Sequence, residues 1–192
     1  MEELDTQPTT PAESAGWGRF FLDILETLLL SAALFLVINA LSARVRVDGS
    51  SMLPTLHNGE FVLVNRLAYR FDAPQRGDIV VFHYPPDPQQ DLIKRVIGLP
   101  GDTVHVQGGT VWVNDEPLDE PYIAQPPLYS GTWVVPPGNL FVLGDNRNDS
   151  SDSHSWGMLP FENIVGKAVL IYWPFQNLQL IDHYDFVKAT HD

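Results

Sequence analysis

The clearest feature of the hydrophobic pattern is one long apolar segment near the N-terminus. Residues 20–43 read FFLDILETLLLSAALFLVINALSA, contain no Pro or Gly, and place apolar side chains on every face of a helix. At about 1.5 Å rise per residue, this helix would be roughly 36 Å long, enough to cross a hydrocarbon core of about 30 Å. Asp23 and Glu26 fall in the first two turns, near the lipid headgroups. We predict a transmembrane helix over 20–43, with a buried or surface-lying amphipathic helix as the alternative.

From residue 44 onward the pattern changes to short β-branched and aromatic runs. FVLVNRL (61–67), DIVVFHY (78–84) and TVWV (110–113) are typical. Turn signals such as Gly108-Gly109 separate the runs, which recur about every 8–15 residues with no helical pattern between them. The chain is therefore predicted to be mainly β, with an antiparallel β-sheet domain over 44–192 behind one N-terminal transmembrane helix.

Residues 1–19 carry four acids, one base and two Pro, with no apolar period. This composition predicts a disordered tail, and because it is not basic it does not resemble the start of a cleaved signal peptide. The charges around the span leave its orientation open, since Arg19 precedes it while Arg44 and Arg46 follow it.

Composition narrows the functional classes. With 11 Lys and Arg against 24 Asp and Glu, the net charge of −13 argues against a nucleic-acid partner. The absence of Cys excludes disulfides, a thiolate nucleophile and Cys-based zinc or iron–sulfur sites. The 16 Pro and 14 Gly suit short strands joined by turns better than a helical bundle.

The segment 91–102 places cations within an apolar strand. In a strand, alternate residues share a face, so each face is an apolar row interrupted by one cation, either Lys94 or Arg95. Burial lowers the pKa of a Lys amine, whereas Arg stays charged. A neutral Lys94 could take the proton of a serine hydroxyl, a known variant of the Ser–His–Asp arrangement. The alternative is a lysine that extends its ammonium group into water.

Two other polar segments are ambiguous when taken alone. Gly49–Leu56 contains Ser50 and Ser51 and by itself indicates only a turn. The polar stretch 144–157 is typical of a solvated loop, and it disfavours calcium because Arg147 stands at the third position and no Gly at the sixth. His154 is a weak candidate base, since neighbours in sequence point in different directions. We expect no metal and no cofactor.

Taken together and in this order behind an apolar span, three segments resemble the conserved boxes of bacterial type I signal peptidases, which are membrane-bound serine proteases. The segments are Val47-Asp48-Gly49-Ser50-Ser51-Met52 with Pro54-Thr55-Leu56, Arg76-Gly77-Asp78 with Lys94–Asp102, and Gly144-Asp145-Asn146 with Ser150, Asp152 and Ser153. The similarity covers roughly residues 20–173. Each box alone is weak, but three in this order are highly specific.

The resemblance implies roles for individual residues. Ser51 would be the nucleophile, Lys94 the general base, and Ser150 the hydroxyl that orients the lysine amine. Asp152 would brace its loop by pairing with a cation such as Arg95. Two positions depart from family patterns. Gly49 stands where one branch has an oxyanion-hole Ser, which leaves mainly the main-chain N–H of Ser51, and His154 stands where the motif ends in Arg.

The resemblance also implies a substrate and a location. The expected substrates are signal peptides of exported preproteins, cut after small residues in sites of Ala-X-Ala type. The preprotein would bind as an extended strand beside residues 45–47 and 91–93. Its expected contacts are Val45, Val47, Met52, Leu92 and Ile93. We expect a monomer in the lipid bilayer of the bacterial plasma membrane, with 1–19 cytoplasmic and 44–192 extracytoplasmic.

Two other functions are alternatives to this interpretation. A self-cleaving Ser–Lys repressor would carry a DNA-binding helix-turn-helix and a basic face, and neither is visible in the sequence. A non-catalytic, membrane-tethered β domain would bind extended peptides in the same way, but loss of catalysis would have allowed Ser51 or Lys94 to drift.

Overall fold

The computed structural model describes residues 16–184 and 186, and the chain divides into two compact units, Met1–Ala40 and Leu41–Asp192. Helix α1 (Gly16–Leu41) accounts for the described part of the first unit. Among the described residues, one helix, Trp17–Leu41, is both long enough and apolar enough to cross a membrane. No part of its most apolar 18-residue segment is buried by protein. A helix that is apolar all round and uncovered is suited to lipid.

The predicted boundaries of the helix need correction. It starts four residues before Phe20, so residues 16–19 are helical rather than part of a disordered tail, and the rest of that predicted tail lies outside the described residues. It also ends at Leu41, two residues before the predicted end, because Ser42 and Ala43 already pair with strand β2.

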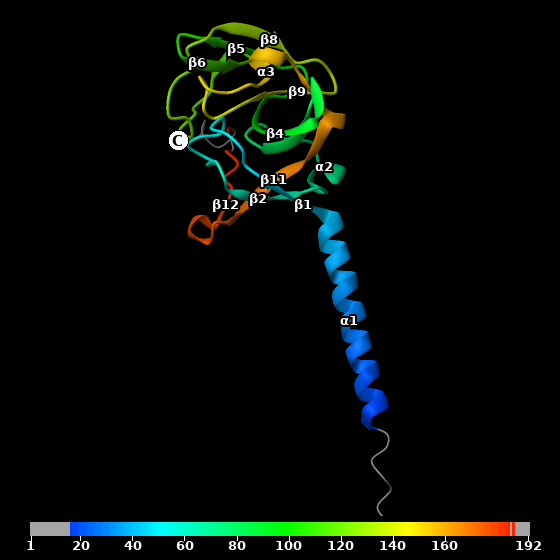
Figure 1. Ribbon diagram of the computed structural model, residues 1–192. Coiled ribbons are helices and arrows are strands. Elements are labelled where there is room, and N and C mark those ends of the chain that lie inside the picture. Colours follow the sequence, from blue (N-terminus) through cyan, green and yellow to red (C-terminus); the bar gives the residue numbers. More distant parts are fainter. Residues whose placement is uncertain (1–15, 185, 187–192) are drawn as a thin grey trace, which may run out of the picture. The chain divides into compact units, whose positions relative to one another are not determined.

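The larger sheet holds eight strands in the order β1-β2-β11-β3-β4-β9-β10, with β12 also paired to β11. Figure 1 labels β1, β2, β4, β9, β11 and β12 of this sheet. Every pairing is antiparallel. Its strands are β1 (Ser42–Arg46), β2 (Phe61–Asn65), β3 (Ile79–Tyr84), β4 (Asp87–Gly98), β9 (Asn139–Leu143), β10 (Leu159–Pro160), β11 (Ile164–Trp173) and β12 (Gln179–Leu180).

A smaller antiparallel sheet of four strands has the order β7-β6-β5-β8. Its strands are β5 (Thr103–Gln107), β6 (Thr110–Val113), β7 (Glu116–Pro117) and β8 (Gly131–Val134). Gly108 and Gly109 connect β5 to β6 with φ values of 61° and 83°, which suits the left-handed two-residue hairpin turn. The short helices are α2 (Ala68–Phe71), α3 (Ser153–Trp156), η1 (Phe161–Asn163) and η2 (Phe175–Asn177).

The core of the second unit follows from strand alternation. In β2, Val62 and Val64 are fully buried, while Phe61 and Leu63, which alternate with them, are only partly buried. Val62 and Val64 join a core cluster that also contains Val47, Met52 and Ile93, so residues next to both Ser51 and Lys94 are anchored in one apolar cluster. The prediction of a mainly antiparallel β domain is confirmed.

Candidate active site

Ser51 and Lys94 meet although 43 positions separate them, with Lys94 Nζ donating to Ser51 Oγ at 2.8 Å. Ser51 lies in the turn that follows β1, where the main-chain N–H of Leu53 donates to the carbonyl of Ser50. Lys94 lies in the interior of β4, directly opposite Val80 of β3. The nucleophile candidate is thus carried by a tight turn and the base candidate by a central strand, which limits movement of the base.

Lys94 is 2% exposed, and among the described residues no carboxylate lies within ion-pair distance of its amine. Its second hydrogen bond, at 2.9 Å, goes to the carbonyl oxygen of Ile93. Burial lowers the pKa of Lys94 to about 8, and the more distant carboxylates of Asp152 and Asp145 oppose this shift without reversing it. A considerable fraction of the amine is therefore neutral near neutral to mildly alkaline pH.

The loop after β9 packs against the turn that carries Ser51. The main-chain N–H of Asn146 donates to the carbonyl of Ser51 at 3.0 Å, and its side-chain amide donates to the carbonyl of Ser50 at 3.1 Å. A Cβ atom added at Gly144 would lie 2.4 Å from the Ser51 carbonyl oxygen, so this close approach requires glycine. Sequence reasoning did not assign a role to Asn146, because a polar loop residue gives no signal of its partner.

Arg95 makes a buried ion pair with Asp145. Its Nε and Nη2 donate to the two carboxylate oxygens at 2.8 and 2.7 Å, and Nη1 donates to the carbonyl of Gly77 at 3.0 Å. Thr55, from the nucleophile segment, donates to the same carboxylate. The prediction that Arg95 pairs with Asp152 is therefore wrong: the strand places the guanidinium beside Asp145, whose bidentate geometry satisfies it.

Asp152 is the N-cap of α3. Its carboxylate accepts hydrogen bonds from the main-chain N–H groups of His154 at 3.2 Å and Gly144 at 2.9 Å. His154 Nδ1 lies 2.6 Å from the same carboxylate and the imidazole stacks on Tyr129, with 4.0 Å between ring centroids. His154 thus occupies the pairing position in which the family pattern has Arg, and its ring nitrogen is directed to Asp152.

The expected hydrogen bond between Ser150 and Lys94 is not formed. Within the described residues, the buried Ser150 hydroxyl has no hydrogen-bond partner, while the amine is already bonded to Ser51 and Ile93. The hydroxyl instead lies against Gly144, where an added Cβ would come within 2.2 Å of it.

A second buried arginine was missed by sequence reasoning. Arg147 makes a bidentate ion pair with Glu120 at 2.7 and 2.6 Å and donates to the carbonyl of Gly144 at 3.1 Å. The ring of Tyr122 lies 4.0 Å from the Arg95 guanidinium and 5.9 Å from that of Arg147. These contacts join the 118–130 segment to the active-site loop, and the spacing of these residues in sequence gives no sign of them.

The expected substrate contacts separate into two groups. Val47, Met52 and Ile93 are buried in one core cluster, and Val45 packs against it while remaining partly exposed. Leu92 lies on the opposite face of β4 and packs with Val80 and Phe82 instead. Its side chain therefore cannot line a pocket with Ile93, because neighbouring strand residues face opposite ways.

Comparison with known proteins identifies the family. The family model described as signal peptidase, peptidase S26, matches residues 21–173. The chain belongs to the S26 signal peptidase family. It is 44% identical over 183 residues to signal peptidase I of Leptolyngbya laminosa, covering 90% of each chain. It is 42% identical to probable signal peptidase I-1 of Synechocystis sp., covering 89% of this chain and 92% of the relative. Signal peptidase I of Bacillus caldolyticus is 41% identical, with coverage of 68% and 79%.

Membership of this family confirms the enzyme class predicted from the three motifs: the chain is a serine protease of signal peptidase type. Its one long, uncovered apolar helix fits membrane anchoring. No cluster of three or more His, Cys, Asp or Glu able to hold a metal ion occurs among residues 16–184 and 186.

Proposed function

We propose that the chain removes signal peptides from exported preproteins with Ser51 as nucleophile and Lys94 as general base. The observation that carries the proposal is the 2.8 Å contact between Lys94 Nζ and Ser51 Oγ, together with the burial that lowers the pKa of Lys94 to about 8. Family membership supports signal-peptide removal, and the dyad supplies its chemistry.

The chemistry follows from the two atoms in contact. With Lys94 neutral, the Ser51 hydroxyl donates to Nζ, and the proton moves to Nζ as Oγ attacks the scissile carbonyl carbon. The resulting ammonium then protonates the leaving amine, the C–N bond breaks, and an acyl ester on Ser51 remains. Lys94 next accepts a proton from water as that water attacks the ester, and returns the proton to Ser51 Oγ as the acid product leaves.

The developing oxyanion needs hydrogen-bond donors from the nucleophile turn. Gly49 has no side-chain hydroxyl, and the Ser50 hydroxyl donates to Asp149 at 2.5 Å. We therefore assign the main role to the main-chain N–H of Ser51. Asn146 supports this assignment because its two hydrogen bonds hold the carbonyls of Ser50 and Ser51 and so fix the intervening peptide plane.

Two strand edges next to the dyad are suited to an extended substrate. β1 pairs only with β2, and β4 pairs with β9 only from Arg95 onward, which leaves one side of its 91–94 stretch without a strand neighbour among the described residues. A substrate strand can hydrogen-bond to such edges. Val45 packs against the buried Val47, Met52 and Ile93, and we expect only shallow pockets at this surface, which would favour Ala at the cleavage site and two residues before it.

The membrane arrangement completes the proposal. We assign residues 1–19 to the cytoplasm, α1 to the plasma membrane and the domain from residue 44 to the extracytoplasmic side, acting as a monomer in the bilayer. Between Leu41 and Ser51 the chain has about ten residues, so it reaches at most roughly 36 Å even when fully extended. The nucleophile is therefore tethered close to the end of the span, where an exported preprotein is still held by its own hydrophobic segment.

The decisive experiment incubates the detergent-solubilised full chain with a preprotein and sequences the new N-terminus. We expect cleavage after Ala by the parent enzyme and none by S51A or K94R, since Arg cannot present a neutral nitrogen. Asp149→Asn, which changes an exposed neighbour of the turn, is the matched control and should retain activity. Appreciable cleavage by K94R would overturn the general-base role, and equal rates for Ala and Phe at the cleavage site would overturn the small pocket.

Topology requires a separate measurement. Protease added outside spheroplasts should digest the domain after Val45 and spare a tag on the N-terminus. The reverse pattern would place Ser51 in the cytoplasm, away from translocated preproteins, and would refute the assigned orientation.

A further inference from the structure

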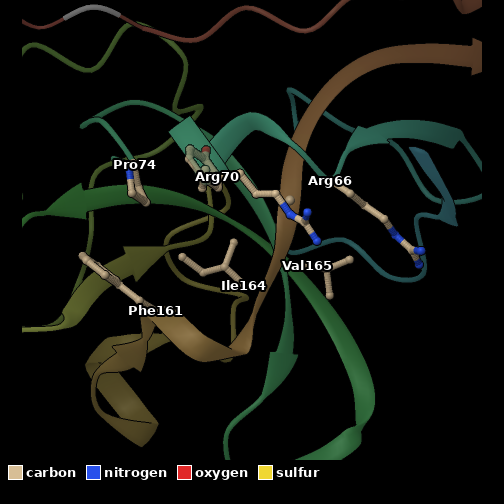
Figure 2. Close-up of a pocket in the computed structure, with 8 residues that line it drawn as sticks. Arg66, Arg70, Pro74, Phe161, Ile164 and Val165 are labelled. Carbon is tan, nitrogen blue, oxygen red and sulfur yellow. The ribbon is translucent and has the colours of Figure 1, made fainter. Parts of the chain in front are cut away.

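A cavity of about 390 Å³, remote in sequence from the dyad segments, lies between α2 and the start of β11. One side is formed by Arg66, Tyr69 and Arg70, and the other by Phe161, Ile164 and Val165. Figure 2 shows Arg70 extending from α2 toward β11, above Ile164, whereas Arg66 lies on the other side of the β11 ribbon in this view and extends away from Phe161. The pocket therefore combines two guanidinium groups with an apolar wall.

Both arginines are without an acidic partner. In the described part of the second unit, Arg76, Arg95, Arg147 and Lys167 all pair with carboxylates. Apart from Lys94, the cations there without any ion pair are Arg44, Arg46, Arg66 and Arg70. In a chain with a net charge of −13, unpaired cations confined to one short stretch of sequence indicate a local site for an anion.

The position of this stretch indicates the source of the anion. The main-chain N–H of Arg66 donates at 3.1 Å to the carbonyl of Leu41, the last residue of α1. Arg44 and Arg46 follow within the next five residues, on strand β1. Arg44, Arg46 and Arg66 are therefore linked, by sequence or by a main-chain hydrogen bond, to the residue at which the chain leaves its membrane-spanning segment, and lipid headgroups lie at such helix ends.

The apolar wall distinguishes a lipid from a free anion. Phe161 is 38% exposed, and the nearby Phe71 at the end of α2 is 84% exposed. A free phosphate would use the guanidinium groups alone, whereas the glycerol and first acyl carbons of a lipid would also cover this apolar surface.

We propose that the pocket between α2 and β11 binds the phosphate headgroup of an anionic membrane lipid. Arg66 and Arg70 donate to the phosphate oxygens, and Phe161, Ile164 and Val165 contact the glycerol and the first acyl carbons. The site is independent of the Ser51–Lys94 chemistry, and its consequence is that the membrane-proximal side of an acidic domain is held to anionic lipid rather than repelled by it.

The test measures lipid binding to the full-length protein in detergent by native mass spectrometry. Short-chain phosphatidylglycerol, phosphatidylcholine and glycerol phosphate serve as probes. We expect R66Q/R70Q to weaken phosphatidylglycerol binding at least about tenfold, since both direct guanidinium–phosphate contacts would be lost. R66K/R70K, which keeps both charges, should bind more tightly than R66Q/R70Q. The matched control R44Q/R46Q removes the same charge beside the span but outside the pocket, and should weaken binding less than about threefold.

Three results would overturn the proposal. Equal losses in R66Q/R70Q and R44Q/R46Q would indicate diffuse electrostatic attraction, equal affinity for phosphatidylcholine would exclude anion selection, and equal affinity for glycerol phosphate would indicate a free-anion site. Cleavage of a soluble peptide by R66Q/R70Q should equal that of the parent, so failure of the lipid site and failure of the proposed catalytic function give different results. The exposed, unpaired arginines have no role in the core, and unchanged thermal unfolding of the variants would confirm that the fold is intact.

Discussion

The guanidinium of Arg95 and the carboxylate of Asp145 form a bidentate ion pair that is almost completely removed from solvent, the two side chains being 1% and 0% exposed. Arg95 follows Lys94 in β4, and Asp145 precedes Asn146, whose main chain holds the carbonyl of Ser51. This ion pair therefore fixes the strand that carries the base against the loop that positions the nucleophile.

Asp145→Asn should strongly destabilise the protein, by about 3–5 kcal/mol in the free energy of unfolding, because Arg95 would remain buried without its charge partner. Denaturant unfolding of the full chain in detergent, followed by tryptophan fluorescence, measures this loss. Asp149→Asn is the control, since its carboxylate accepts a hydrogen bond from Ser50 but is exposed, and it should cost about 1 kcal/mol or less. Similar losses in both variants would show that the buried pair is not the main structural restraint.

The rate of cleavage should rise with pH through a midpoint near 8. Burial lowers the pKa of Lys94 to about 8, and only the neutral amine, which prevails above that pH, accepts the Ser51 proton. The measurement is kcat/KM for a peptide substrate from pH 5.5 to pH 9.5, a range of about four units that covers both Lys94 and His titration.

His154→Gln is the control for this profile, because His154 touches Asp152 rather than the dyad. Its midpoint should match that of the parent. A midpoint near the ordinary pKa of histidine, or one that disappears in His154→Gln, would contradict Lys94 as the titrating base.

Gly144→Ala should reduce activity more than it reduces stability. The new methyl group would lie 2.2 Å from the Ser150 hydroxyl and 2.4 Å from the Ser51 carbonyl, and the nucleophile turn would have to move. A displacement of this kind costs about a hundredfold in rate. Turnover per folded molecule, measured beside thermal unfolding, separates the two effects.

Gly98→Ala is the matched control. Its methyl group would lie 2.7 Å from Val104 and 2.9 Å from Val135, a core clash of comparable severity away from the dyad. It should lower the unfolding temperature while folded molecules keep the parental kcat. Equal loss of kcat in both variants would mean that the position of Gly144 has no special relation to catalysis.

Asn146→Ala should lower kcat by about fivefold with little change in KM, because it removes the side-chain donor to the Ser50 carbonyl, a hydrogen bond that contributes about 1 kcal/mol. Asn148→Ala removes hydrogen bonds to Leu128 and Pro126 on the exposed side of the same loop, and should retain kcat. Steady-state kinetics of both variants show whether Asn146 positions the nucleophile turn or only stabilises its loop. Equal losses of kcat in the two variants would support only loop stabilisation.

Local chemistry was sufficient to predict the architecture of this chain from its sequence. A long run of apolar residues without Pro or Gly forms a helix that lies in lipid or in a protein core. Short β-branched runs between turn signals form antiparallel strands. The candidate nucleophile Ser51 and the candidate base Lys94 could be named from the sequence because their segments match family motifs. The end of the helix could not be predicted from the sequence. Ser42 and Ala43 belong to β1 because they pair with residues 65 and 64, more than 20 positions away.

Tertiary structure alone decided which charges meet. Arg95 could have paired with either of two nearby aspartates, and only the register of β4 against β9 brings it to Asp145 while Asp152 caps α3. The same holds for the Arg147–Glu120 pair and for the unpaired Arg66 and Arg70. Electrostatic partners are chosen by distance and burial in three dimensions, which depend on the packing of the whole sheet, whereas helix and strand formation depends mainly on residues a few positions apart.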